Sequence, residues 1–153
     1  MIPTQSKRER TTLFGCLSFR TKKFYWKSAS IGNAKSFIAF LHQMRLNFPG
    51  KRLLFILDNS SVHKNKKVKA FLEKFTEIRL LCLPTYSPEY NPVEKIWWWL
   101  KPKIYGLFAL GKGLAELLAR VRKLFWHFNE RRLVDPIDLK LNAYHKIINI
   151  LAD

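Results

Sequence analysis

The chain has 153 residues, of which 48% are hydrophobic and 14% aromatic, which is enough for the core of one globular domain and excludes a disordered tail. Its 28 Lys and Arg residues against 11 Asp and Glu give a formal net charge of +17, which favours a polyanionic partner, nucleic acid before any other. The two cysteines form no C-x-x-C pair, which excludes a zinc finger or knuckle.

No targeting or membrane segment is visible in the sequence. No apolar run approaches the ~18 residues that a membrane-spanning helix needs, and residues 1–10 (MIPTQSKRER) are a polar, extended lead-in rather than a signal peptide. We therefore expect a cytoplasmic protein without a membrane partner or a small-molecule substrate. Cys16 and Cys82 lie in apolar runs and are expected to be buried free thiols.

The first predicted elements are a β-hairpin and a helix. Residues 11–19 and 23–28 read as two strands joined by a turn at 20–22. A helix is predicted over residues 33–47, with Asn33 as its N-cap and Pro49-Gly50 beyond its end. Its apolar side chains recur at helical spacing, at Phe37, Phe40, Leu41 and Met44.

Two short apolar runs predict the next strands. Residues 52–58 and 77–83 have the continuous hydrophobic character of strands that are buried on both faces of a sheet. A helix over 65–75 separates them and turns four apolar side chains inward: Val68, Phe71, Leu72 and Phe75.

Helices dominate the remainder of the chain. One is predicted over 91–101, with Asn91 as N-cap and Pro92 at its first position, and Pro102 is expected to end or kink it. A weaker helix is predicted over 139–151. A strongly amphipathic one covers 114–128, with a stripe of Leu114, Leu117, Leu118, Val121, Phe125 and Phe128. Strands that alternate with helices predict a mixed α/β sheet with helices on both faces.

Asp58 and Glu94 are the candidate catalytic carboxylates. Asp58 ends an apolar strand, and the C-terminal edge of such a strand is where open α/β sheets place their sites; a turn or capping role is the alternative. Glu94 stands at the third position of the helix predicted over 91–101, where it could equally close a capping box with Asn91. Two carboxylates at the ends of neighbouring elements suit a magnesium ion, which takes oxygen ligands. The pair predicts a metal-dependent site that acts on nucleic acid.

Several polar and basic residues surround these carboxylates in the sequence. Asn59, His63 and Asn91 could support the site, although a lone His is often structural. The basic residues either form a solvated face or contact phosphate; they are Lys64, Lys66, Lys67, Lys69, Lys95 and Lys101.

Three consecutive tryptophans, residues 97–99, cannot share one face of a helix. Trp97 falls on the apolar stripe of its helix, and core packing explains it. Trp98 falls on the polar side, one turn beyond Glu94, where it could stack on a base, meet a partner subunit or remain an exposed aromatic.

These residues together resemble the bacterial insertion-sequence branch of the mariner-type DDE transposases. The resemblance covers roughly residues 11–106, and 35 residues separate Asp58 from Glu94, close to the spacing of the family. It is carried by Asp58-Asn59, His63, residues 83–88 (LPTYSP), residues 91–94 (NPVE), Trp97 and Leu100-Lys101.

The resemblance implies a ribonuclease-H-like fold in which three acidic residues bind two magnesium or manganese ions. Asp58 matches the second acid and Glu94 the third. The metals activate water or a DNA 3′-hydroxyl for in-line attack on a phosphodiester and steady the leaving oxygen. The implied partners are DNA, as transposon ends and target, and a second copy in a dimer to which Trp98 and Trp99 could contribute. The protein would be nucleoid-associated.

The chain departs from the family pattern at its N-terminus. The family's first Asp lies on a strand before the hairpin, whereas here only residues 1–10 precede it, and Glu9 has no strand behind it. We therefore expect an N-terminally truncated sheet without its first catalytic strand. Residues 11–106 would be a partial catalytic domain and residues 107–153 its helical extension, with an upstream segment supplying the first Asp and a helix-turn-helix.

Three functions compete at this point. The first is the catalytic part of a transposase that cleaves and joins DNA once the upstream segment is present. The second is a non-catalytic, basic, nucleic-acid-binding remnant of a transposase. The third is a basic structural protein, in which the Asp58 and Glu94 pair would have no role.

Overall fold

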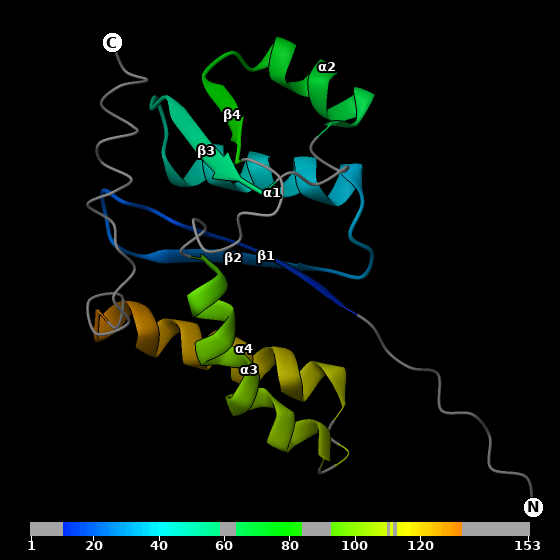
Figure 1. The fold of residues 1–153 in the computed structure, drawn as a ribbon, viewed down its shortest axis with the longest axis vertical. Helices are drawn as coiled ribbons and strands as arrows, with labels where there is room; N and C mark the ends of the chain where they lie inside the picture. The colour runs from blue at the N-terminus through cyan, green and yellow to red at the C-terminus, as the bar shows by residue number, and fades with distance from the viewer. Residues whose placement is uncertain (1–10, 59–63, 84–92, 110, 112, 133–153) are drawn as a thin grey trace, which may run out of the picture.

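A computed structural model describes residues 11–58, 64–83, 93–109, 111 and 113–132, and it has a mixed α/β fold. Helices lie on both sides of the first hairpin (Figure 1). The lead-in predicted over residues 1–10 and the helix predicted over 139–151 lie outside the described residues. The elements in chain order are β1 (Thr12–Leu17), β2 (Phe24–Ala29), α1 (Ala34–Asn47), β3 (Leu53–Leu57), α2 (Lys66–Lys74), β4 (Ile78–Cys82), α3 (Val93–Ala109) and α4 (Leu114–Glu130).

The strands form two separate sheets in the described part of the chain. β1 and β2 pair antiparallel, and β3 and β4 pair parallel, but no ladder joins the two pairs. The predicted mixed α/β class is confirmed, but the described strands form two pairs rather than one continuous sheet. β1 and β3 line one cavity and form no ladder with each other in this part of the chain.

The hairpin separates two hydrophobic clusters because side chains alternate along a strand. Leu13 and Leu17 of β1 pack, with Phe24 of β2, against α3 and α4. Phe14 and Cys16 point to the other side and join the cluster of α1, α2 and β3. We call these the α3–α4 cluster and the α1–α2 cluster.

Phe24 is the centre of the α3–α4 cluster. Its side chain is 1% exposed, and its ring lies 4.6 Å from the Phe125 ring and 5.5 Å from the Trp97 ring, between centroids. Its backbone N–H donates to Asn129 Oδ1 at 2.7 Å, and Asn129 Nδ2 donates to its carbonyl oxygen at 2.9 Å. One amide of α4 thus takes the place of a neighbouring strand along the outer edge of β2.

The predicted cap of α1 is present, and α2 has a cap that was not predicted. Asn33 accepts a hydrogen bond from the Ser36 backbone N–H at 3.0 Å, and the Ser36 hydroxyl accepts one from the Asn33 N–H at 2.9 Å. Asn65 caps α2 through the backbone N–H of Lys67. Satisfied first-turn donors explain why both helices begin at the residues that the sequence indicates.

Pro102 was expected to end or kink its helix, and it does not end it. α3 continues through it to Ala109, at the cost of the hydrogen bond that a residue with an N–H would make. The helix is held beyond this point by tertiary packing, since Ile104 contacts the α3–α4 cluster. On α4 the buried stripe includes Leu124, which the predicted stripe omitted, while Leu114 and Leu118 are only half-buried.

The prediction that β3 and β4 are buried on both faces is wrong. Phe55 and Ile78 are buried, but Leu54 is 42% exposed and Cys82 is exposed rather than buried. Both strands pack one face on α1 and α2, and no described helix covers the other face completely. The apolar character of these strands therefore exceeds what the described neighbours bury.

Candidate functional site

Asp58 follows directly on the last residue of β3 and is exposed. The strand is apolar throughout, and an ionised carboxylate cannot remain unpaired inside such a run, so Asp58 stands where the strand leaves the sheet. This is the C-terminal edge of a strand in a parallel pair, at which α/β proteins place ligands.

Glu94 is the second residue of α3 and is half-buried. A carboxylate in the first helical turn is favoured by the positive end of the helix dipole. Its proposed capping partner, Asn91, lies outside the described residues. The helix itself is anchored by Ile96 and Leu100, which are both buried in the α3–α4 cluster, so the position of Glu94 is fixed by packing one turn further along.

Asp58 and Glu94 line the same cavity, which has a volume of about 580 Å³. All residues of β1 and all residues of β3 line it too, and Phe37, Phe40 and Met44 of α1 contribute apolar side chains. We call this cavity the β1–β3 cleft. Elements that are far apart in sequence thus bring the two candidate carboxylates to the lining of one cavity.

A complete metal centre is not present in the described part of the chain. Among those residues, no group of three or more His, Cys, Asp or Glu side chains lies close enough together to hold an ion. Two carboxylates fit a hard divalent cation, which takes few protein ligands and keeps several waters. The described residues therefore supply part, but not all, of the ligands that a divalent metal site needs.

The predicted supporting residues Asn59, His63 and Asn91 all lie outside the described residues. The remaining predicted residues are described, and their positions show which of them could meet a polyanion.

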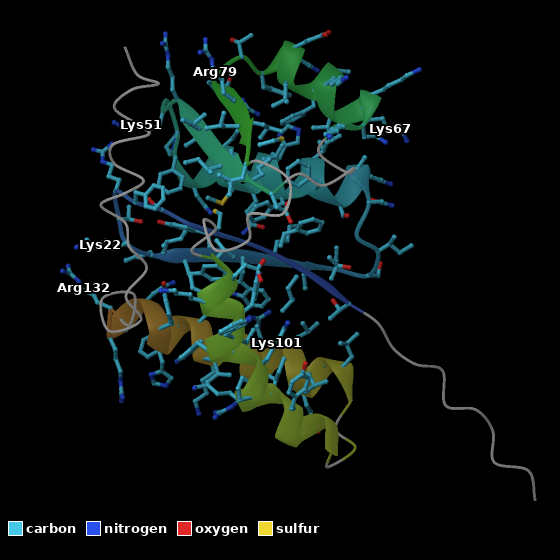
Figure 2. All side chains as sticks on the ribbon, viewed as in Figure 1. Lys22, Lys51, Lys67, Arg79, Lys101 and Arg132 are labelled. Atoms are coloured by element: carbon cyan, nitrogen blue, oxygen red, sulfur yellow. The ribbon has the colours of Figure 1, made fainter. Side chains whose placement is uncertain are left out.

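The lysines of α2 lie on its outer face. Lys66, Lys67 and Lys69 are exposed, as is Lys64 just before the helix, whereas Val68 and Phe71 point into the α1–α2 cluster. Figure 2 shows Lys67 on α2 and Lys101 on α3, on opposite sides of the hairpin. The predicted basic residues therefore do not form one patch, and positive charge is spread over several faces of the molecule.

Two of the three tryptophans of α3 lie as predicted: Trp97 packs against the α3–α4 cluster, and Trp98 is 74% exposed. Trp99, which was predicted as a possible dimer contact, packs against the same cluster instead. Lys95 is half-buried and Lys101 is exposed on the same helix. The exposure of Trp98 leaves its ring available for stacking, which is compatible with a base or with a protein partner.

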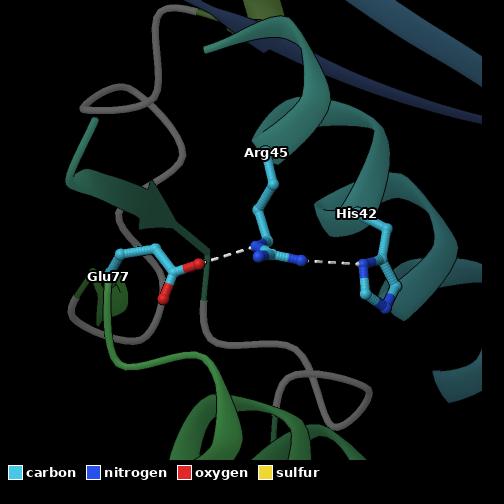
Figure 3. A network of polar contacts seen from close by, with 3 residues as sticks. All are labelled: His42, Arg45 and Glu77. Carbon is cyan, nitrogen blue, oxygen red and sulfur yellow. Dashed lines mark hydrogen bonds and ion pairs between the residues drawn. The ribbon is translucent and has the colours of Figure 1, made fainter. Parts of the chain in front are cut away.

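An Arg45–Glu77 ion pair, which no local pattern in the sequence predicts, joins α1 to the residue before β4. Arg45 Nε donates to Glu77 Oε1 at 2.7 Å, and Arg45 Nη1 lies 3.3 Å from His42 Nδ1 (Figure 3). The guanidinium also lies 3.8 Å from the centre of the Phe75 ring. A hydrogen bond from its own backbone and then the bond from Arg45 lower the pKa of Glu77. This network fixes the β3–β4 pair on α1.

The two thiols differ in environment. Cys16 lines the β1–β3 cleft, and its thiol donates to Met44 Sδ at 3.7 Å. Burial raises the pKa of the Cys16 thiol to about 12, so it stays protonated and unreactive at neutral pH. Cys82 is free and exposed at the end of β4, outside the cleft.

In the described part of the chain, no helix is both long enough and apolar enough to cross a membrane.

The mixed α/β fold places two carboxylates, one after a strand and one at a helix start, on the lining of one cleft. Comparison with known families gives the class of protein: residues 2–108 match the family described as DDE superfamily endonuclease. The chain belongs to that family.

A relative from an insertion element supports the same assignment. The chain is 31% identical over 100 residues to the "Insertion element IS630 uncharacterized 39 kDa protein" of Shigella sonnei. The matched region is 63% of this chain and 28% of the relative, so the chain spans well under half the length of that protein. The resemblance to an insertion-sequence transposase DDE domain is thereby confirmed.

Proposed function

We propose that the chain is part of the catalytic domain of a mariner-type insertion-sequence transposase, which cleaves DNA strands and transfers them during transposition. The observation that carries the proposal is the meeting of Asp58 and Glu94 at the β1–β3 cleft in a chain that belongs to the DDE endonucleases. Residues 11–106 would form the partial ribonuclease-H-like domain, and residues 107–153 its helical extension.

Asp58 and Glu94 would each supply carboxylate oxygens to divalent metal, magnesium or manganese, in a two-metal site. When bound, such metals generate the nucleophile and stabilise the charge on the leaving oxygen. The half-buried position of Glu94 limits its side-chain freedom, while exposed Asp58 keeps room for a phosphate. Asn59, His63 and Asn91 are proposed as supporting residues on sequence grounds alone.

A third carboxylate is needed to complete the site, and we propose that an upstream segment supplies it. This accords with the two-carboxylate cleft of the described residues and with the short share of the Shigella relative that the chain covers. The first catalytic strand and a DNA-recognising helix-turn-helix would come from that segment.

DNA is the proposed partner, both as transposon ends and as target. The net charge of +17 and the exposed lysines of α2 favour phosphate contacts that carry no sequence information. Lys64, Lys66, Lys67, Lys69, Lys95 and Lys101 are proposed to make them, with Trp98 stacking on a base. A homodimer on paired ends would use the same exposed surface of α3.

Nicking of supercoiled plasmid DNA tests this proposal. The chain is assayed with Mg²⁺ or Mn²⁺, alone and together with the polypeptide encoded directly upstream. We expect metal-dependent nicking by the pair, and its loss, by at least about a hundredfold, in Asp58→Asn and Glu94→Gln because each removes a charged metal ligand. Glu73→Gln is the matched control, since Glu73 is an exposed carboxylate of α2 outside the cleft.

A non-catalytic nucleic-acid-binding remnant is the second candidate, favoured by the incomplete ligand set among the described residues. It predicts DNA binding that weakens steeply with salt and that Asp58→Ala leaves intact. Binding without nicking, in the presence of the upstream polypeptide and metal, would decide for this candidate.

A further inference from the structure

Three short basic segments of the chain are exposed at turns of the fold. Residues 20–23 read RTKK, residues 51–52 read KR and residues 131–132 read RR, and all of their side chains are exposed. The first joins β1 to β2, the second leads into β3 and the third follows α4. Every residue of these turns except Thr21 is a lysine or an arginine, and none of them is among the basic residues proposed above to contact DNA.

Contacts between neighbouring elements hold the three turns next to one another. The Tyr25 ring packs on the Phe48 ring with centroids 5.2 Å apart, which brings the start of β2 against the turn before β3. Asn129 Oδ1 accepts the backbone N–H of Phe24 at 2.7 Å, which brings the end of α4 to the same end of β2. Thr21 Oγ1 lies 3.3 Å from the Tyr25 hydroxyl oxygen, which ties the hairpin turn to the same ring.

The folded chain therefore gathers positive charge that is scattered in the sequence. Lys22, Lys51 and Arg132, one from each turn, lie along one side of the molecule (Figure 2). We call the exposed cations of these three turns the three-turn surface. Like charges gathered in this way repel one another, so the arrangement lowers the stability of the fold and favours a polyanionic partner.

Two of these cations stand at backbone positions that disfavour them. Lys22 has a φ of 57° and Arg132 a φ of 49°, and they are the non-glycine residues with positive φ in the part of the chain that the structure describes. Glycine or asparagine adopts this left-handed conformation at a lower cost than lysine or arginine. Local stability therefore does not explain a cation at either position, whereas a binding role accounts for both.

The chemistry of the three-turn surface suits phosphates rather than bases. The exposed aromatic side chains of the described residues are Trp98, Tyr105 and Trp126, which lie on α3 and α4 and outside these turns. Proteins that hold single-stranded nucleic acid stack its bases on such rings, whereas cations contact the phosphate backbone whatever the sequence. A surface of cations without exposed rings therefore fits the backbone of a duplex.

The three-turn surface lies away from the candidate carboxylates. Residues 51–52 also line the β1–β3 cleft, but they precede β3 whereas Asp58 follows it. A rise of ~3.3 Å per strand residue places Arg52 roughly 20 Å from Asp58. At ~3.4 Å per base pair, a phosphate at Arg52 is about six base pairs from one at Asp58. Contacts at this distance change how tightly a duplex is held rather than the charge around a reacting phosphate.

We propose that the three-turn surface binds the phosphate backbone of double-stranded DNA, without reading its sequence, at a distance from the candidate carboxylates. That the polyanion is DNA rests on the proposed function. The surface adds a contact to those proposed for the lysines of α2 and α3, and it determines the affinity for a duplex segment beyond the point of cleavage.

Fluorescence anisotropy tests the proposal with the full chain and a labelled duplex of about two helical turns. EDTA is present, so that no metal-dependent cleavage occurs. The test variant is Lys22→Gln/Lys51→Gln/Arg132→Gln, which has one change in each turn.

A second triple variant is the matched control. Lys35→Gln/Arg120→Gln/Lys123→Gln removes the same charge from exposed side chains of α1 and α4, outside the three turns.

The two triple variants should differ strongly in affinity. At about 0.1 M salt we expect the test variant to bind the duplex about a hundredfold more weakly than the natural chain, and the control less than about fivefold more weakly. The slope of log K against log salt concentration should become less steep by about 2–3 in the test variant, since each phosphate contact contributes about 0.9. Two duplexes of unrelated sequence should give the same result.

Several results would overturn the three-turn surface. Equal weakening by the two triple variants would show that charge acts from any part of the surface. Tighter binding of the corresponding single strand, or of phosphatidylserine vesicles, with the same dependence on the three cations would identify another partner.

Two further variants separate charge from folding. Lys22→Gly/Arg132→Gly removes two cations and relieves the left-handed backbone, so its melting temperature should stay the same or rise while DNA affinity falls by about tenfold or more. Unchanged affinity in this variant would contradict the proposal. Lys22→Arg/Lys51→Arg/Arg132→Lys keeps every charge and should bind as the natural chain does, and weak binding by a folded protein here would exclude a role based on charge.

The readout is separate from DNA cleavage. Binding that depends on the three cations, without nicking by the chain and its upstream polypeptide, would keep the three-turn surface and remove the nuclease proposal. Nicking by that pair, with the same DNA affinity and the same rate at limiting DNA in the test variant, would keep the nuclease proposal and remove the three-turn surface.

Discussion

The two sides of the β1–β2 hairpin are built differently. On the α3–α4 side, aromatic rings surround Phe24 and the Asn129 amide occupies the free edge of β2, so both side chains and backbone groups have partners. On the α1–α2 side, the cluster is similarly apolar but borders the β1–β3 cleft, which the two candidate carboxylates line and across which β1 and β3 form no ladder in the described part of the chain. The two sides thus share an apolar interior but differ in how completely the described residues fill it.

Truncation of a central aromatic ring should reveal this difference most strongly. Phe24→Ala is expected to lower the free energy of unfolding by about 4–5 kcal/mol, since the ring is fully enclosed. Phe55→Ala, in β3 beside the cleft, should cost about 2–3 kcal/mol because its surroundings can relax into existing space. Urea denaturation of both variants measures the two values, and equal losses would show that the two sides are packed alike.

Removal of the Asn129 amide is expected to have the next largest effect. Asn129→Ala leaves the N–H and C=O of buried Phe24 without partners, at a cost of about 2–3 kcal/mol. Asn129→Asp keeps an acceptor for the N–H but loses the donor to the carbonyl, so its loss should be smaller at neutral pH. Thermal unfolding ranks the variants, and a larger loss for Asp than for Ala would contradict the proposed edge role.

Two glycines allow a paired test of the closed side. A Cβ on Gly15 would lie 2.2 Å from Phe24 Cζ and 2.9 Å from Trp97 Cη2, so Gly15→Ala should destabilise the fold by about 1–3 kcal/mol through overpacking. A Cβ on Gly106, within α3, meets nothing within 4 Å. Gly106→Ala should therefore stabilise by about 0.5–1 kcal/mol through helix propensity. Chemical denaturation that shows the same sign for both changes would rule out close packing at Gly15.

The Arg45–Glu77 pair should give the smallest effect and one that depends on pH. The pKa of Glu77 is lower in the folded protein than in the unfolded chain, so its stabilising contribution is complete above the unfolded pKa of about 4.3 and disappears as the pH falls through the folded value. Glu77→Gln should therefore be less stable than the natural protein at pH 7 and equally stable at about pH 2. Thermal melts at both pH values check this, and a difference that persists in acid would exclude the ionised carboxylate as its cause.

The placement of the two candidate carboxylates could be predicted in part from local sequence. The apolar run before Asp58 and the helix start at Glu94 each indicate a carboxylate at the end of an element, and the structure places both residues on the lining of one cleft. Asn129 and Arg45 gave no such signal. Each acts on a partner that is remote in sequence, 105 and 32 residues away, so neither local periodicity nor a short motif could reveal it.

Local sequence is sufficient to predict the order of strands and helices, the cap at Asn33 and the family to which the chain belongs. These depend on short-range hydrogen bonds, on the spacing of apolar residues and on a motif, all of which are encoded within a few neighbouring positions. Tertiary structure alone decided that α3 runs through Pro102, that Cys82 and Leu54 are exposed, and that the strands form two sheets with a cleft between them. Those features depend on which surfaces meet after folding, because burial and edge pairing are properties of contacts between distant segments.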